Sequence, residues 1–87
     1  MKEKMIVISP INLKIPIHAR VGKINPDYQS NMIIYFSGRR FEWVRTILTP
    51  VLASDLSRAL DTQNIKDWFG REIELYSDNN DIRARVP

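Results

Sequence analysis

The sequence predicts one mainly β domain with a single helix, in the order β-β-β-α-β-β. Five short segments show the two-residue alternation, or the β-branched and aromatic composition, that is typical of strands. One stretch between the third and fourth of them, residues 50–60, carries apolar residues at helical spacing. A chain of 87 residues buries too little of its surface to support two separate cores, so we expect residues 1–87 to form one domain.

The first predicted strand covers residues 13–21. Pro16 cannot donate a ladder hydrogen bond, which favours an edge position or a bulge in a strand that bends. Residues 22–30 contain Asn25-Pro26-Asp27 and are predicted to form the following loop. The apolar face of this strand consists of Leu13, Ile15, Ile17, Ala19 and Val21.

Residues 31–36 and 41–48 are predicted to form a hairpin, because the turn-forming residues 37–40 separate two β-rich segments. The inward set of the first of these strands consists of Met32, Ile34 and Phe36. In the second, Trp43 alternates with Val44, and the pattern leaves open which of the two points inward.

The helix is predicted to run from about Pro50 to about Leu60. Thr49 supplies an N-cap hydroxyl, and Pro50 fits the first helical position, where its missing N–H costs nothing. The face that packs on the strands consists of Leu52, Leu56, Ala59 and Leu60.

Beyond the helix we expect one further turn, residues 65–70, whose apolar residues Ile65, Trp68 and Phe69 pack inward and plug an end of the barrel. Trp68 is predicted to plug that end, because Ile65 and Phe69 flank it at helical spacing. Two strands follow, residues 71–76 and 81–86, and their inward residues are Ile73, Leu75, Ile82, Ala84 and Val86. Residues 1–12 fit either an extra strand or an N-terminal arm.

This order, with a long bent first strand and a helix between the third and fourth strands, is the connectivity of the oligonucleotide/oligosaccharide-binding (OB) barrel. SH3-like barrels have only a short turn where this chain has a helix, and a ferredoxin-like fold needs a second long helix. The predicted fold is therefore an OB-fold-like five-stranded barrel.

The second half of the chain contains an apolar helix and the segment from Lys66 to Tyr76, Lys-Asp-Trp-Phe-Gly-Arg-Glu-Ile-Glu-Leu-Tyr, followed by a basic closing strand, residues 82–86. In these segments it resembles a group of small, poorly characterised phage and prophage proteins. The resemblance implies an OB-like accessory protein, encoded among phage replication and recombination genes, that contacts single-stranded DNA. The chain departs from the family pattern at residues 48–52, where Leu-Thr-Pro-Val-Leu replaces a polar Leu-Asn-Lys-Thr-Asn type segment.

Composition favours a cytoplasmic domain with an anionic partner. The chain has no cysteine, so neither a disulfide framework nor a thiolate metal site can form, which is typical of cytosolic domains. The apolar run Met5–Ile8 is too short for a membrane span. The net charge is +3, and residues 1–48 hold eight Lys/Arg against three acids, an asymmetry that is also common in ordinary soluble domains.

Single-stranded nucleic acid binds to aromatic rings surrounded by positive charge. In OB domains these groups lie on the second and third strands, where Tyr35 is the first candidate; Trp43 and Arg45 extend its platform if Trp43 points outward. Against this interpretation, acidic side chains accompany the last two strands: Glu72, Glu74, Asp78 and Asp81. The predicted nucleic-acid-binding residues are Lys14, Arg20, Tyr35, Arg39, Arg40, Trp43, Arg45, Arg83 and Arg85.

We expect neither catalysis nor a metal or organic cofactor. His18 is the only histidine, so no histidine metal centre or Cys/His nucleophile pair can form within one chain. Asp55 is predicted to be an ordinary exposed acid of the helix. The alternative function is a protein-binding module that docks on a replication or host-defence protein, through the Arg39-Arg40 hairpin or an exposed sheet edge.

Overall fold

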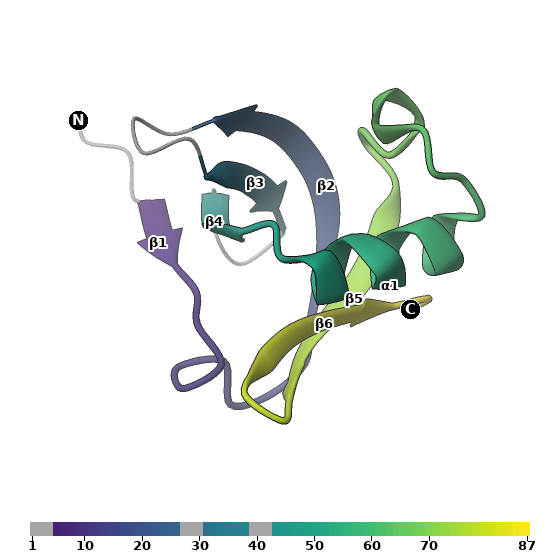
Figure 1. The fold of residues 1–87 in the computed structure, drawn as a ribbon. Helices are drawn as coiled ribbons and strands as arrows, with labels where there is room; N and C mark the ends of the chain where they lie inside the picture. Colours follow the sequence, from purple (N-terminus) through teal and green to yellow (C-terminus); the bar gives the residue numbers. More distant parts are fainter. Residues whose placement is uncertain (1–4, 27–30, 39–42) are drawn as a thin grey trace.

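The structure is a computed structural model that describes residues 5–26, 31–38 and 43–87. In these ranges the fold is mainly β with one helix (Figure 1). In chain order the elements are β1 (Met5–Val7), β2 (Ile17–Pro26), β3 (Met32–Ser37), β4 (Trp43–Ile47), α1 (Pro50–Leu60), the 3₁₀ turn η1 (Ile65–Asp67), β5 (Glu72–Asp78) and β6 (Asp81–Arg85). No helix in the described ranges has the length and apolar character needed to cross a membrane.

The strands form one curved sheet in the order β1-β4-β3-β2-β5-β6. Strands β2 to β6 pair antiparallel, and β1 runs parallel to β4. The predicted order is therefore roughly matched, and residues 5–7 form an additional strand. Within the described residues β4 and β6 do not pair with each other, so the sheet is open and closure of the barrel is not shown.

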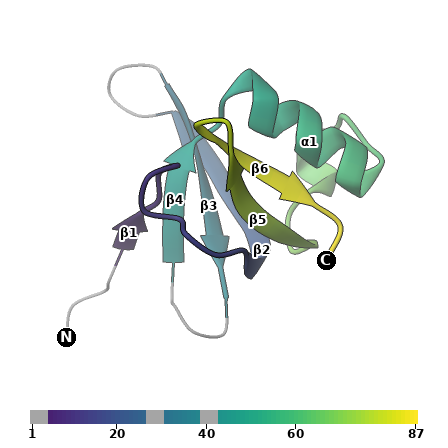
Figure 2. The ribbon, with the colours of Figure 1, turned by 90° about the horizontal axis from the view of Figure 1, so that it is seen from below.

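Helix α1 packs against the inner face of the sheet, next to β6 (Figure 2). Its start agrees with the prediction, since the Thr49 side chain accepts a hydrogen bond from the Leu52 N–H at 3.2 Å and Pro50 is the first helical residue. Leu52 and Leu56 are fully buried. The core that they complete contains Ile34, Phe36, Val44, Trp68, Ile73, Leu75, Ile82 and Ala84.

Strand β2 differs from the prediction at both ends. It begins at Ile17 because Pro16 has no N–H to donate and residues 9–13 form a turn, in which the Leu13 N–H donates to the Ser9 carbonyl at 3.0 Å. Ile15, predicted to point inward, lies before the strand and is 70% exposed. At the other end, residues 22–26 continue the strand instead of forming a loop, and a bulge between Val21 and Ile24 keeps them paired with β3.

Four other apolar residues predicted to pack inward are exposed. Met32 is the first residue of β3 and is 41% exposed, and Val86 lies beyond the end of β6 and is 65% exposed. Ile65 and Phe69 point to solvent from the turn after α1. Trp68, between them, is 2% exposed and donates its indole N–H to the Thr62 carbonyl at 2.8 Å, which confirms that it is a core residue.

Candidate functional site

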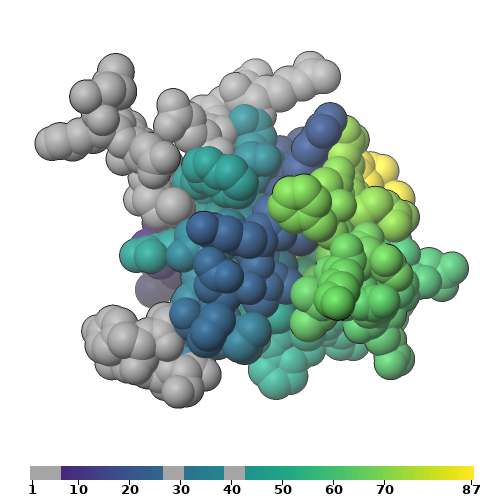
Figure 3. All heavy atoms as spheres, turned by 90° about the horizontal axis from the view of Figure 1, so that it is seen from above, coloured from purple at the N-terminus to yellow at the C-terminus, as the bar shows by residue number. Residues whose placement is uncertain are grey.

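Strand alternation gives β2, β3 and β4 two different faces. Phe36 and Val44, which are partners in register, are buried in the core with the leucines of α1. The neighbouring pair, Tyr35 and Arg45, points the opposite way. We call this surface the outer face; on it β2, in blue, lies between the teal of β3 and β4 and the green of residues near the start of β5 (Figure 3).

Trp43 belongs to the outer face, which decides the alternative that the sequence left open. It alternates with the buried Val44, and its side chain lies over Gly22 of β2. A Cβ atom on Gly22 would come within 2.6 Å of Cζ3 of Trp43 and 2.9 Å of the Tyr35 carbonyl oxygen. The missing side chain at Gly22 therefore lets the indole approach the backbone of β2, where it remains half-buried.

The bulge in β2 adds a cation to this aromatic surface. Between the register pairs Val21–Phe36 and Ile24–Ile34, two residues of β2, Gly22 and Lys23, face one residue of β3, Tyr35. The Lys23 ammonium lies over the Tyr35 ring, 5.2 Å from its centroid. The sequence prediction missed Lys23, because residues 22–30 were expected to form a loop.

Positive charge on the outer face is available near Tyr35. Lys23 and Arg45 are exposed, and neither forms an ion pair within the part of the chain that the structure describes. Arg20 differs, because its guanidinium contacts the Glu72 carboxylate at 3.2 Å. Glu72 also lies 3.1 Å from His18 Nε2. These groups are at least half exposed, and such surface pairs contribute only about 0–1 kcal/mol, so a phosphate can compete for Arg20.

Arg85 lies on β6, at the acidic margin of the sheet. It pairs with Glu74 at 2.7 Å and stacks over the Tyr76 ring at 4.3 Å. The hydrogen bond to Glu74 raises the pKa of the Arg85 guanidinium above its ordinary value. Arg85 is therefore partly neutralised and is separated from Tyr35 by β2 and β5.

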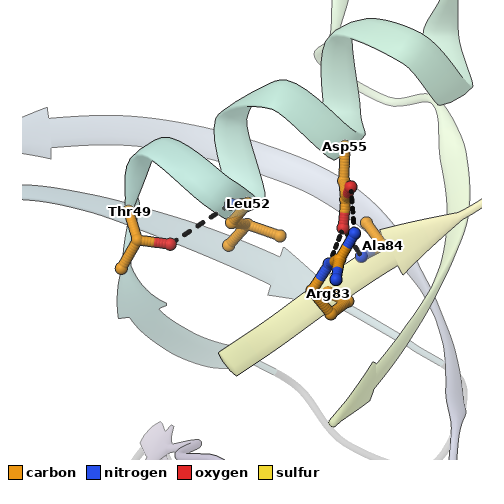
Figure 4. Close-up of polar contacts among 5 residues, drawn as sticks. All are labelled: Thr49, Leu52, Asp55, Arg83 and Ala84. Atoms are coloured by element: carbon orange, nitrogen blue, oxygen red, sulfur yellow. Dashed lines mark hydrogen bonds and ion pairs between the residues drawn. The ribbon is translucent and has the colours of Figure 1, made fainter. Parts of the chain in front are cut away.

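Arg83 has a different setting from the other predicted binding residues (Figure 4). Its guanidinium donates to both carboxylate oxygens of Asp55, at 2.6 and 3.0 Å, and the Ala84 N–H donates to the same carboxylate at 3.1 Å. Asp55 is 5% exposed, so the prediction of an ordinary exposed acid is wrong. The hydrogen bond from Arg83 lowers the pKa of Asp55 below its ordinary value and raises that of Arg83. This arrangement links α1 to β6. Because the Arg83 guanidinium is bound to Asp55, it is not available to a ligand in the way that an exposed arginine is.

The remaining predicted residues do not join the outer face in the described structure. Lys14 is exposed in the irregular segment before β2 begins. Arg39 and Arg40 lie outside the described residues. Of the nine predicted binding residues, the strands thus bring together Arg20, Tyr35, Trp43 and Arg45.

The outer face combines aromatic rings with exposed cations. In residues 5–26, 31–38 and 43–87 no group of three or more histidine, cysteine or acidic side chains is placed to hold a metal ion. The aromatic rings and the exposed cations match the two features that nucleic acid offers, flat bases and phosphates.

No protein-family model matches the chain, and searches of curated proteins and of solved structures find no match to it.

Proposed function

We propose that this protein is an OB-type binding module that contacts single-stranded DNA through its outer face. The observation that carries the proposal is the position of Tyr35 and Trp43 on one face of β3 and β4, beside the exposed cations Lys23 and Arg45. The strand order supports the OB assignment, because β4-β3-β2-β5-β6 with α1 between β4 and β5 is the order of that fold.

Energetics favour displacement of Lys23 from the Tyr35 ring by a base. An exposed cation–π contact contributes about 0.5–1 kcal/mol, whereas a base stacked on an aromatic side chain contributes about 1–3 kcal/mol. The displaced ammonium remains next to the ring, where it can contact a phosphate. In the free protein Lys23 thus covers the Tyr35 ring. Binding replaces this weak cation–π contact by a stronger stack between a base and the ring.

The proposed setting is a phage or prophage replication or recombination system in the host-cell cytoplasm. This part of the proposal depends on the resemblance of residues 66–76 to the phage proteins. The lack of cysteine is in keeping with a reducing compartment.

The experiment is a titration of oligo(dT) followed by tryptophan fluorescence at about 50 and 200 mM salt. Trp68 is buried, so quenching by the ligand reports on Trp43. Tyr35→Ala should weaken binding by roughly five- to a hundredfold, the equivalent of about 1–3 kcal/mol. Absence of binding at the lower salt concentration would rule out the proposal.

A matched pair of variants tests the charge component. Arg45→Gln removes a cation from the outer face, and Arg58→Gln removes an exposed cation from α1, so the two variants have the same net charge. We expect only Arg45→Gln to lower the slope of log affinity against log salt, by about 0.7 for one lost phosphate contact. Equal slopes for both variants would mean that Arg45 makes no such contact. A parallel titration with oligo(rU) measures the preference for DNA.

The alternative is a protein-binding module, and the exposed apolar residues between β1 and β2 favour it. Ile11 is 81% exposed and Ile15 is 70% exposed. In this case the partner is a replication or host-defence protein. Its binding should survive Tyr35→Ala and Arg45→Gln and should be lost on replacing Ile11 and Ile15 by serine.

A further inference from the structure

Two isoleucines lie on the outer face next to Tyr35 and Arg45. Ile33 of β3 and Ile47 of β4 are partners in register, and so are Tyr35 and Arg45, two residues away on each strand. Residues two apart on a strand point to the same side of the sheet. Ile34, between Ile33 and Tyr35, is fully buried on the opposite side. The two isoleucines therefore share the face of Tyr35 and Arg45.

This isoleucine pair is not part of the core. Ile47 is 48% exposed and Ile33 is half-buried, whereas Val44, a core residue of β4, is 3% exposed. The solvent-facing side of an antiparallel sheet usually carries polar residues at such positions. A β-branched pair across two strands also stabilises a sheet by itself, so the pair alone identifies no ligand. Its position beside Tyr35 does.

Tyr35 has different neighbours on its two sides along the strands. On one side lies Trp43, whose indole extends over Gly22 of β2. On the other side lie Ile33 and Ile47. Residues of one strand that share a face are about 7 Å apart, and register partners are about 5 Å apart. Aliphatic side chains are therefore within reach of the edge of a base that stacks on the Tyr35 ring.

Thymine offers such side chains a matching group, the methyl group at C5. The other DNA bases lack it, and contact with an apolar side chain is a common way in which proteins recognise it. We propose that Ile33 and Ile47 contact the C5-methyl group of a thymine stacked on Tyr35, so that the outer face prefers thymine to bases without this group. This inference rests on the proposed function and adds a base preference to it.

The first test compares oligo(dT) with oligo(dU) of the same length, titrated into the wild-type protein at about 50 mM salt. The two ligands have the same sugar and charge and differ only in the C5-methyl group. Oligo(dT) should bind about two- to fourfold more tightly, because burial of one methyl group contributes up to about 0.8 kcal/mol. Oligomers of 5-methyl-dC and dC should show the same ratio. Equal affinities for oligo(dT) and oligo(dU) would overturn the inference.

A matched pair of variants identifies the side chain responsible. Ile47→Ser removes an aliphatic group from the outer face, and Ile65→Ser removes one of similar exposure, 45%, from the turn after α1. Ile47→Ser should bring the ratio of the oligo(dT) and oligo(dU) affinities close to one, and Ile65→Ser should leave it at the wild-type value. A methyl effect that acts through stacking alone would survive Ile47→Ser, and that result would also overturn the inference.

The ratio within one variant is a robust readout. Both ligands are titrated into the same preparation, so a partial loss of folded protein changes the two apparent affinities alike and leaves their ratio unchanged. The melting temperatures of Ile47→Ser and Ile65→Ser show separately how much each substitution destabilises the fold.

The outcomes separate the two proposals. If wild-type protein binds oligo(dT) and oligo(dU) equally, the methyl contact is wrong and the outer-face function stands. If wild-type protein binds neither ligand at about 50 mM salt, the proposed function fails and the base preference fails with it.

Discussion

At the scale of single residues, Asp55 lies on α1 with its carboxylate accepting hydrogen bonds from two residues of β6. The Arg83 guanidinium supplies two of them, and the Ala84 N–H supplies the third. Strand β6 is the last strand of the sheet in the described ranges, and this backbone N–H bonds to Asp55 in place of a further strand. Asp55 therefore provides an acceptor for the Ala84 N–H on the outer edge of β6 and holds α1 against that strand.

We predict that Asp55→Ala destabilises the protein by about 2 kcal/mol, because it leaves a buried N–H unpaired and removes charged hydrogen bonds. Urea unfolding followed by circular dichroism measures the change. The control is Ser54→Ala at the adjacent exposed helix position, which should change stability by less than about 0.5 kcal/mol. Equal midpoints for the two variants would contradict a stabilising role of Asp55.

The lowered pKa of Asp55 also predicts a pH dependence of stability. The hydrogen bond from Arg83 holds the folded-state pKa below the ordinary value of 3.8, so the unfolded chain takes up the proton first on acidification. The contribution of Asp55 is therefore complete above pH 3.8 and is lost as the pH falls through the lower folded-state pKa. Asp55→Asn should show a smaller loss of stability than wild type between about pH 5 and 2, measured by urea unfolding. Parallel pH profiles would contradict this.

At the scale of elements, the bulge in β2 organises the outer face. It brings Lys23 over Tyr35, and Gly22 leaves the space that the Trp43 indole fills. A regular strand in this place would present one residue opposite Tyr35 in place of two, and the cation over the ring would be lost.

Gly22→Ala tests this arrangement. The new Cβ would meet Cζ3 of Trp43 at 2.6 Å and the Tyr35 carbonyl at 2.9 Å, so the indole must move and the backbone must shift. We expect a loss of about 1–3 kcal/mol in stability and a red-shifted tryptophan emission as Trp43 becomes more exposed. Combining Gly22→Ala with Trp43→Phe should abolish the shift. An unchanged emission spectrum in Gly22→Ala would show that the indole does not depend on Gly22.

At the scale of the whole molecule, the two edges of the antiparallel sheet, β4 and β6, are covered by different elements. The edge of β4 is covered by β1, which continues into the bond from the Ile8 N–H to the Arg45 carbonyl at 2.9 Å. The edge of β6 is covered by α1 through Asp55. An open sheet of this kind needs both covers to avoid pairing with another chain.

Deletion of residues 1–7 should therefore expose the edge of β4 and favour association. Size-exclusion chromatography with light scattering should show a larger, concentration-dependent mass for the shortened chain than for the full one. Replacing Arg45, which lies on that edge, by proline in the shortened chain should reduce the association, because proline blocks strand pairing, whereas about 0.5 M salt should leave the association in place. A mass equal to that of the full chain at every concentration would contradict a covering role of β1.

Local patterns were sufficient for the elements whose structure depends on near neighbours. The helix from Pro50 to Leu60 and its Thr49 cap follow from spacing and capping chemistry, and the structure confirms both. Alternation also identified Ile73 and Leu75 of β5 as inward residues. These features depend on residues no more than a few positions apart, so the sequence carries them directly.

Tertiary structure decided which side of each pattern is buried and which side chains meet. Trp43 lies outward because α1 covers the Val44 side, and Asp55 is buried because β6 offers it an arginine and a free N–H. Phe69 is exposed because Trp68 takes the core position. Each outcome depends on segments that are distant in the sequence, and alternation alone relates neighbouring residues to one another without specifying which face another element will cover.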